Sequence, residues 1–452
     1  MYRTFLSWRY MRSRPTNWIG IMGIFVGVGA LILILSIMSG FLAESRRAVR
    51  GSLADLIVQP LRMGEVGSAQ AVVAAILEHP DVAGVTVQLH WGGMLTWGGR
   101  YSGYVADQLA QPNFADLPAV QIIGIDVESE LRTTEFARAL QNPENERDRC
   151  ADLEHPFAPP PDYRPQGRPL SGIIVGEQLM QALDFRRGQD ARLLVPVPVR
   201  DKSGNVELTV NDRQYVVAGA YRSGENDVDL DTVYLPREEL VEFLGGAADY
   251  SQILVRLVDY ERDGERVAAE INARLAEKDL LERAGPLRVR TWEQFKQGLI
   301  GAIENEKMLM GIMLSLVLVV AGFNILAILS MLVTEKRRDI GILCALGATS
   351  RGILVLFLLI GFWDALLGAT LGALVGVWGA LRIDSIERWI SSTFNIQIFN
   401  REVYLFDHIP TVVDPVGVAL IVVGAFACTL VFAALPAIKA ARMHPLDALR
   451  YE

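Results

Sequence analysis

The chain has 452 residues, of which 51% are hydrophobic and 21% are charged, and its formal net charge is −9 at pH 7. Its mean hydropathy of +0.26 excludes a disordered chain, which would be poor in aliphatic side chains and dominated by charge. The same balance is too apolar for an ordinary soluble protein, because the apolar residues are concentrated in a few long runs.

Four runs of apolar residues are each long enough to cross a lipid bilayer. At about 1.5 Å of rise per helical residue, about 20 such residues span the roughly 30 Å hydrocarbon core. The first run is too long for the core of a cleavable signal peptide, which has about 7 to 15 residues. We therefore predict four transmembrane α-helices, over residues 18–42, 308–333, 353–381 and 416–438.

Basic residues indicate which segments stay in the cytoplasm. Arginines without any acidic residue precede the first run, and basic residues also gather between the second and third runs and after the fourth. Because cytoplasmic loops are enriched in such residues, we expect residues 1–17, 334–352 and 439–452 to be cytoplasmic. Residues 43–307 and 382–415 then lie outside. The large outer segment is acidic, which argues against a nucleic-acid partner.

Residues 43–307 form one extracytoplasmic insertion with mixed secondary structure. Runs typical of strands alternate with helical patterns, so we predict an α+β domain large enough for two subdomains. The proline-rich segment 142–169 indicates a loop or a subdomain junction. Residues 291–307 begin with Trp292 and predict an interfacial helix that continues unbroken into the second span.

The sequence lacks the common motifs of catalysis. It has no Gly-Lys pair, so the phosphate-binding Walker loop is missing. The five histidines do not have the spacing of metal ligands, and the Gly-x-Ser-x-Gly motif is absent. We therefore expect no enzymatic activity, no metal site and no bound cofactor in this chain, with any ATP hydrolysed elsewhere.

Two features inside the spans are unusual. Asp364 places an ionisable group within the third span, which predicts a hydrogen bond to a neighbouring helix, the alternative being proton coupling. Small-residue stripes in two spans predict close helix packing, the alternative being a substrate groove. These stripes consist of Gly20, Gly23 and Gly27 in the first span and Gly368, Gly372 and Gly376 in the third.

Several segments spread over nearly the whole chain resemble the permeases of lipoprotein-releasing ABC transporters of the LolC/LolE type, within the MacB/FtsX-like permease superfamily. Four of these segments are "RYMRSRPTNWIGIMGIFVGVGALILILSIMSGF", "TWEQFKQGLIGAIENEK", "VAGFNILAILSMLVTEKRRDIGILCALGATSRGI" and "LPAIKAARMHPLDALRYE". Residues 334–348 and the C-terminal motif are shared with the wider superfamily, whereas Trp292, Phe323-Asn324-Ile325 and Val403-Tyr404 point more narrowly to the lipoprotein-releasing branch. Further segments of this kind are "QIIGIDVESE", "GIIVGEQLMQAL" and "VAGAYRSGENDVDLDTVYLP".

The resemblance implies a membrane protein with a MacB-like periplasmic domain of porter and sabre-like subdomains, located in the bacterial inner membrane. It implies that the chain extracts lipoproteins from the outer leaflet and passes them to a LolA-like periplasmic carrier. Its partners would be a dimer of a LolD-like cytoplasmic ATPase, which holds ATP and Mg²⁺, and a second permease chain in a homodimer or a LolC/LolE-type heterodimer. Membrane lipid surrounds the spans.

Two other functions share this architecture. A MacB-like exporter normally carries its nucleotide-binding domain on the same chain, and no Walker sequence is present here. An FtsX-like mechanotransmitter would activate a cell-wall hydrolase, but its exported domain is generally much smaller than residues 43–307.

Three sets of residues are candidate functional sites. The loop after the second span is amphipathic and predicts an ATPase-coupling helix, with a basic membrane anchor as the alternative. Its candidate residues are Glu335, Arg337, Arg338, Ile340, Leu343, Leu346, Gly347 and Ala348.

Aliphatic and methionine residues of the first two spans suit acyl chains, with plain lipid contact as the alternative. This predicted substrate groove consists of Val28, Leu31, Leu35, Met38, Met310, Met313, Leu314 and Val317. A predicted hairpin over residues 196–213 lies where such permeases carry a carrier-recruiting hook. Its candidate residues are Pro196, Pro198, Arg200 and Arg213.

Overall fold

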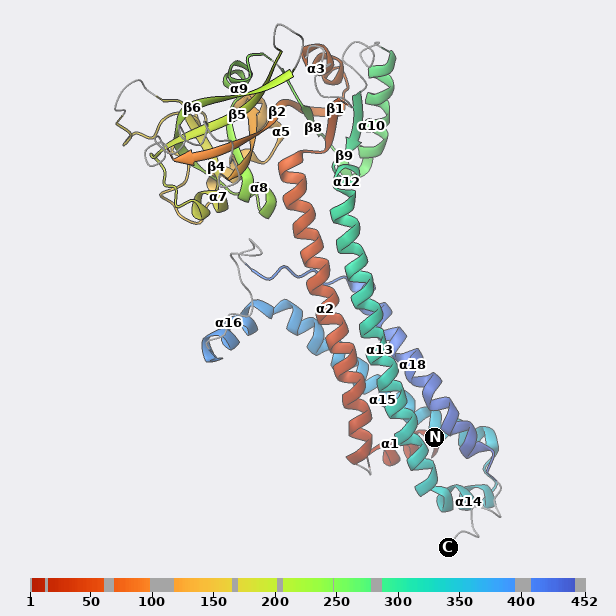
Figure 1. The fold of residues 1–452 in the computed structure, drawn as a ribbon. Helices are drawn as coiled ribbons and strands as arrows, with labels where there is room; N and C mark the ends of the chain where they lie inside the picture. Colours follow the sequence, from red (N-terminus) through yellow and green to blue (C-terminus); the bar gives the residue numbers. More distant parts are fainter. Residues whose placement is uncertain are drawn as a thin grey trace. The chain divides into compact units, whose positions relative to one another are not determined.

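The structure is a computed structural model, and it separates into two compact units that are described one at a time (Figure 1). One unit contains residues 1–44 and most of residues 299–452, and the other contains residues 45–298. The residues described are 2–12, 15–60, 69–97, 118–164, 170–200, 206–246, 248–277, 287–394 and 408–443.

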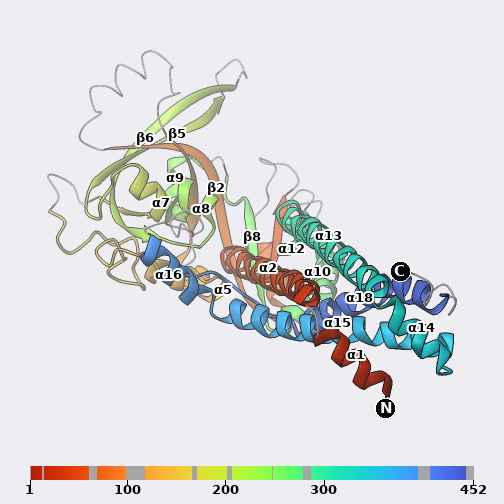
Figure 2. The same ribbon diagram turned by 90° about the horizontal axis from the view of Figure 1, so that it is seen from below.

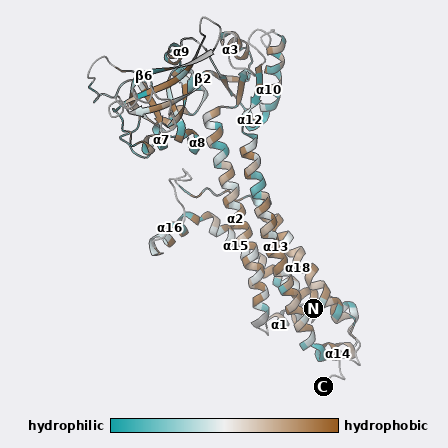
Figure 3. Cartoon of the chain, viewed as in Figure 1, coloured by the Kyte–Doolittle hydropathy of each residue, from teal (hydrophilic) through white to brown (hydrophobic). Residues whose placement is uncertain are grey.

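The first unit is a helical bundle. Among the described residues, four of its helices are long and apolar enough to cross a membrane, which confirms the four predicted spans. Figure 3 shows hydrophobic residues along the length of these helices. The long helices are α2 (Pro15–Leu53), α13 (Gln297–Glu335), α15 (Ser350–Leu381) and α18 (Pro415–Ala441), and the shorter ones are α1 (Tyr2–Arg12), α14 (Arg337–Ala345) and α16 (Ile383–Phe394).

The glycine stripe of α15 is a packing surface. A Cβ added at Gly372 would lie 2.7 Å from the carbonyl oxygen of Phe25, and one at Gly376 would lie 2.9 Å from the carbonyl oxygen of Gly29. The backbones of α2 and α15 therefore approach so closely that only glycine fits, as expected where lipid removes the hydrophobic drive for helix association. The stripe at Gly20, Gly23 and Gly27 faces α13 instead, against Ile328, Ala321 and Leu318.

The second unit is the predicted α+β domain, and its strands form a mixed sheet with parallel and antiparallel pairs. Strands β2, β3, β7, β4, β6 and β5 pair in a closed ring, and β2 continues from this ring into a second sheet with β8, β1 and β9. The strand bounds are β1 (Leu56–Pro60), β2 (Val82–Trp97), β3 (Ala119–Ile125), β4 (Gly172–Gly176), β5 (Asp190–Arg200), β6 (Val206–Tyr221), β7 (Thr232–Pro236), β8 (Gln252–Leu257) and β9 (Leu287–Thr291).

The unit has two apolar cores, one for each part of the sheet. The core of the closed ring includes Leu193, Val195 and Tyr215, while α3 and α10 cover the second sheet with residues such as Val72 and Ile271. The helices are α3 (Ala69–Leu77), α5 (Val127–Thr133), α6 (Phe136–Gln141), α7 (Glu177–Ala182), α8 (Asn226–Asp231), α9 (Arg237–Phe243), α10 (Tyr260–Glu277) and α12 (Trp292–Phe295).

The predicted unbroken helix over residues 291–307 is wrong in one respect. Thr291 and Gln294 form a reciprocal capping box that begins the single turn of α12. The turn ends at Lys296, whose φ of −97° and ψ of 24° depart from helical values, and α13 begins one residue later. From Gln297 onward the helix is continuous through the second span.

Candidate functional site

A short helix, α14, is present where the sequence predicts the coupling helix. Its C-terminus is a Schellman motif, in which the amide of Gly347 donates to the carbonyl of Cys344 (3.0 Å) and that of Ala348 to Leu343 (2.9 Å). Gly347 has a φ of +93°, a conformation that glycine adopts without strain. The turn releases the chain into α15, whose N-cap Thr349 accepts from the amide of Gly352.

The eight predicted coupling residues divide between the bundle and the surface. Ile340 is buried, and Leu343 and Ala348 pack against the same core. Arg337 is half-buried, whereas Glu335, Arg338 and Gly347 are exposed. Leu346 is 81% exposed at the end of the helix, beside Ile342 at 44%. The C-terminal end of α14 therefore exposes two aliphatic side chains, Ile342 and Leu346.

An aromatic and ionic contact connects α14 to the N-terminal helix. The ammonium of Lys336 lies 3.1 Å from the carboxylate of Asp339 and 5.2 Å from the ring centroid of Tyr10. The hydroxyl of Tyr10 donates to the same carboxylate, at 3.4 Å. The start of α14 is therefore fixed against α1, while its C-terminal end presents Leu346.

Two residues of the predicted substrate groove are buried. Val28 and Leu31 are 0% and 4% exposed, and Val28 packs directly against Gly372 of α15. Both residues belong to the bundle core. The sequence could not separate them from groove residues, because inside a bilayer a helix is apolar on its protein-facing and its lipid-facing sides alike.

The remaining groove residues are more open. Leu35, Met38, Met310 and Leu314 are half-buried, and Met313 and Val317 are 72% and 43% exposed. An apolar groove of about 600 Å³ does lie between α2 and α13, with Val317 as the member it shares with the prediction. It is lined by Trp18, Ile19, Met22, Gly23, Val26, Val317, Val320, Ala321 and Asn324.

The predicted hairpin is formed by β5 and β6, which pair antiparallel from Asp190 and Val216 to Arg200 and Val206. Figure 2 shows the two strands extending together beyond their neighbours. The turn, residues 201–205, lies outside the described residues, and of Pro198 and Arg200 the structure describes the backbone. The carbonyl of Pro196 accepts from the indole of Trp91 (3.0 Å).

Arg213 belongs to the base of this hairpin. Its guanidinium lies 3.6 Å from the carboxylate of Glu239 and 3.5 Å from that of Glu242, and 5.4 Å from the ring centroid of Phe243. These contacts hold β6 against α9, so Arg213 positions the hairpin and is not displayed at its tip.

A buried carboxylate, which sequence reasoning missed, joins the end of α2 to the exported domain. Asp55 is fully buried; it pairs with Arg50 of the last turns of α2 (2.8 Å) and accepts from the amide of Leu257 in β8 (2.8 Å). Its carbonyl accepts from the amide of Trp292, at the start of α12 (3.1 Å). One residue therefore connects the segments that precede and follow the whole domain.

A second contact at these helix ends is the loop of residues 223–225. The carboxylate of Asp229 accepts from the amide of Ser223 (2.7 Å) and from that of Gly224 (3.2 Å). Burial raises the pKa of Asp229 to about 6. The loop presents Gly224 to Ala48 of α2, and Glu225 pairs with Lys296 at the break before α13 (2.9 Å).

A buried polar network lies where β2 passes from one part of the sheet to the other. Glu130 of α5 accepts from Thr86, Gln88 and Thr134, at 2.9 to 3.0 Å. Gln88 also accepts from Gln252 of β8 at 2.7 Å. Burial raises the pKa of Glu130 to about 7. These contacts hold β2 in place where it passes between the two sheets, because leaving any of these buried polar groups without a hydrogen-bond partner would destabilise the fold.

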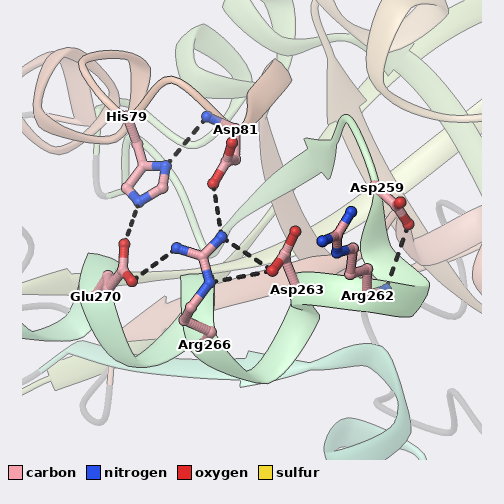
Figure 4. Close-up of polar contacts among 7 residues, drawn as sticks. All are labelled: His79, Asp81, Asp259, Arg262, Asp263, Arg266 and Glu270. Carbon is pink, nitrogen blue, oxygen red and sulfur yellow. Dashed lines mark hydrogen bonds and ion pairs between the residues drawn. The ribbon is translucent and has the colours of Figure 1, made fainter.

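The densest ionic cluster on the exported domain is structural (Figure 4). Arg266 of α10 pairs with Asp81, Asp263 and Glu270 at 2.9 to 3.0 Å, and His79 contacts the same Glu270. The carboxylates are thus satisfied by one guanidinium and connect α10 to the turn before β2. Among the residues that the structure describes, no group of three or more His, Cys, Asp or Glu side chains is placed to hold a metal ion.

Comparison with known proteins finds relatives that are similar to nearly the whole chain. Over 98% of its length the chain is 27% identical to 98% of the lipoprotein-releasing system transmembrane protein LolC of Neisseria meningitidis serogroup B. Over 98% of both chains it is 23% identical to the corresponding LolE of Haemophilus influenzae. A solved structure of the periplasmic region of MacB from Actinobacillus actinomycetemcomitans aligns with 57% of this chain and over 97% of its own length. The sequence identity is 11% and the TM-score is 0.29.

Two family models match the chain in the order in which its parts occur. The MacB-like periplasmic core domain matches residues 18–274, and the FtsX-like permease C-terminal domain matches residues 311–445. The resemblance to LolC and LolE permeases drawn from the sequence is thereby confirmed. The chain belongs to the family with a MacB-like periplasmic core domain, here followed by an FtsX-like permease C-terminal region.

Proposed function

We propose that this chain is a permease subunit of an ABC transporter that extracts lipoproteins from the outer leaflet of the inner membrane and passes them to a periplasmic carrier. The observation that carries the proposal is similarity along nearly the whole chain to transmembrane proteins of lipoprotein-releasing systems. Such a step requires an energy source, since each buried methylene of a lipid anchor stabilises membrane binding by about 0.8 kcal/mol. ATP and Mg²⁺ bind a separate cytoplasmic ATPase dimer, and a second permease chain completes the transporter.

The membrane orientation follows from the order of the helices. The MacB-like domain lies between α2 and α13, and we propose that it is periplasmic and that the other end of α13 is cytoplasmic. We propose that α14 is the cytoplasmic coupling helix and that Leu346 enters the ATPase. The basic residues near the ends of α13 and α18 support this orientation.

A single substitution tests the coupling helix. Leu346→Asp should abolish binding and stimulation of the ATPase subunit, because it places a charge in an apolar contact. The matched control is Leu381→Asp, at the opposite end of α15, where the side chain is 69% exposed. Leu346 is preferred to Gly347, since any substitution at a φ of +93° would also strain the backbone. Equal ATPase stimulation by the wild type and Leu346→Asp would contradict the assignment.

The lipoprotein path is proposed to follow the exposed apolar surface of α13 and its groove with α2. A photo-crosslinking residue at Met313 or Val317 should capture a lipoprotein in the absence of ATP and lose it when ATP is trapped. A crosslinker at Leu374 of α15, which is 68% exposed, is the control for contact with bulk lipid. Equal capture at all three positions in both states would refute the path.

The hairpin is proposed to contact the carrier. Val197 and Thr209 pair directly, so replacing residues 198–208 with Asn-Gly closes the hairpin by a two-residue turn. The shortened protein should fold and stimulate the ATPase but fail to bind the carrier in a pull-down. Undiminished carrier binding would show that the contact lies elsewhere.

The function as a whole is tested by depletion. Cells depleted of the chain should retain lipoproteins in the inner membrane, as measured by membrane fractionation, and purified transporter in proteoliposomes should release a triacylated lipoprotein to the carrier only with ATP. Normal lipoprotein localisation together with failed cell-wall hydrolysis would instead indicate an FtsX-like function.

A further inference from the structure

A pocket of about 590 Å³ lies at the end of the bundle where α15 begins and α18 ends. It is separate from the groove between α2 and α13 and from the exposed end of α14. It is lined by Ser350, Arg351, Leu354, Ile438, Ala441, Arg442 and Met443. Beyond the pocket, farther along α15, the two helices pack closely, since a Cβ added at Gly361 would lie 2.6 Å from the Cβ of Ala433.

The polar rim of this pocket is positively charged. Arg351 and Arg442 are both exposed, and within the described part of the chain neither guanidinium has a carboxylate partner. The pocket also contains the N-terminus of α15. Thr349 binds the amides of Gly352 and Ile353, which leaves the first two amides of a 32-residue helix for another acceptor. Two guanidinium groups and a helix N-terminus together favour an anion such as a phosphate.

The wall of the pocket is aliphatic and continues into an exposed stripe. Leu354, Ile438 and Met443 line it beside the arginines. Ile438 lies on the same face of α18 as Leu435 and Val431, because the spacings of three and four residues bring side chains into line. These two residues are 60% and 67% exposed. An occupant must therefore be anionic at one end and aliphatic along the rest.

We propose that this pocket binds an anionic phospholipid, with the phosphate between Arg351 and Arg442 and an acyl chain along Ile438, Leu435 and Val431. A free phosphate would leave the aliphatic wall uncovered. In the proposed orientation the pocket faces the cytoplasmic leaflet, where anionic lipids are abundant and juxtamembrane arginines bind them. The inference depends on that orientation and not on lipoprotein transport.

The test uses the full-length protein in detergent with added dioleoylphosphatidylglycerol, dioleoylphosphatidylcholine or inorganic phosphate. Native mass spectrometry measures lipid retention, and a thermal-shift assay measures protection. The double variant Arg351→Gln/Arg442→Gln is compared with Arg382→Gln/Arg388→Gln, which removes two exposed arginines beyond the opposite end of α15. We expect the wild type and the control to retain phosphatidylglycerol, and the double variant to bind it about 30-fold more weakly.

Four results would overturn the proposal. The first is equal retention of phosphatidylglycerol by the double variant and the wild type, and the second is equal protection of the wild type by the two lipids. The third is protection by inorganic phosphate alone, which would show a site for a soluble anion. Loss of the ATPase subunit from the double variant with unchanged lipid retention would also refute it, since the pocket would then be a protein contact. If the double variant aggregates, Arg351→Gln alone replaces it, because that side chain is exposed.

Discussion

The carboxylate of Asp55 should contribute strongly to the stability of the exported domain, because it joins the last turns of α2 to β8. Asp55→Ala removes the nearest carboxylate of Arg50, whose other partner Glu261 lies 3.6 Å away, and the carboxylate that lies 3.7 Å from Arg256. It also leaves the amide of Leu257 without its side-chain acceptor. The backbone contacts of residue 55 with Val255 and Trp292 survive the change. The substitution therefore removes the side-chain contribution alone.

The size of the effect follows from burial. Asp55 is fully buried while Arg50 is 29% exposed, and breaking a buried pair by removing one partner costs about 3 to 5 kcal/mol. Arg50 can regain some water, so we take the lower end, about 3 kcal/mol, of which the unsatisfied amide contributes about 1 to 3 kcal/mol. For a domain of this size about 1 kcal/mol lowers the melting temperature by roughly 2 to 4 °C. The melting temperature should therefore fall by roughly 6 to 12 °C.

The assay is thermal unfolding of the full-length protein in detergent, followed by near-ultraviolet circular dichroism. The control is Asp249→Ala, which removes a 2.7 Å ion pair with Arg237, close to the 2.8 Å of the Asp55 pair. The side chains of Asp249 and Arg237 are 48% and 27% exposed. It should cost no more than about 1 kcal/mol. Asp55→Asn should fall between the two, since its amide oxygen can still accept from Leu257. A melting temperature of Asp55→Ala within 2 °C of that of Asp249→Ala would refute the reasoning.

Three further predictions concern helix packing, coupling and pH. Gly372→Leu should separate α2 from α15 and lower the free energy of unfolding by about 1 to 3 kcal/mol. The control Gly424→Leu lies in open space and should be neutral. Equal melting temperatures of the two variants in a thermal-shift assay would contradict the packing of α2 against α15. Lys296→Glu should reduce ATP-dependent lipoprotein release, because it places two carboxylates together at the helix break. Adding Glu225→Lys should restore release. If the double variant is not restored, the ion pair does not act in coupling. Because burial raises the pKa of Glu130 to about 7, the folded state binds this proton more tightly than the unfolded state, and the contribution of Glu130 to stability is lost as the pH rises from about 4.5 to 7. The difference in stability between the wild type and Glu130→Gln should change over this range by no more than about 3 kcal/mol, and a pH-independent difference would refute the assignment.

The sequence alone determined the features that depend on composition within one segment. The length of an apolar run decides whether a helix can cross a bilayer, so all four spans were predictable. The charges and apolar residues after the second span lie within one short stretch, and the helix α14 they predicted is present. The similarity to LolC and LolE permeases was also readable from local motifs, since it extends through the whole chain.

Tertiary structure decided which faces of those segments are used and which distant residues meet. Val28 belongs to the core because α15 presents glycine to it, and the helix before the second span breaks at Lys296, beside its ion pair with Glu225. Asp55 is an unremarkable acidic residue in the sequence and becomes the joint of the domain only when β8 brings Leu257 to it. The physical reason is that hydrophobic length and helix propensity are local, whereas burial and pairing depend on residues far apart in the sequence, such as Asp55 and Leu257, 202 positions apart, that only the folded chain brings together.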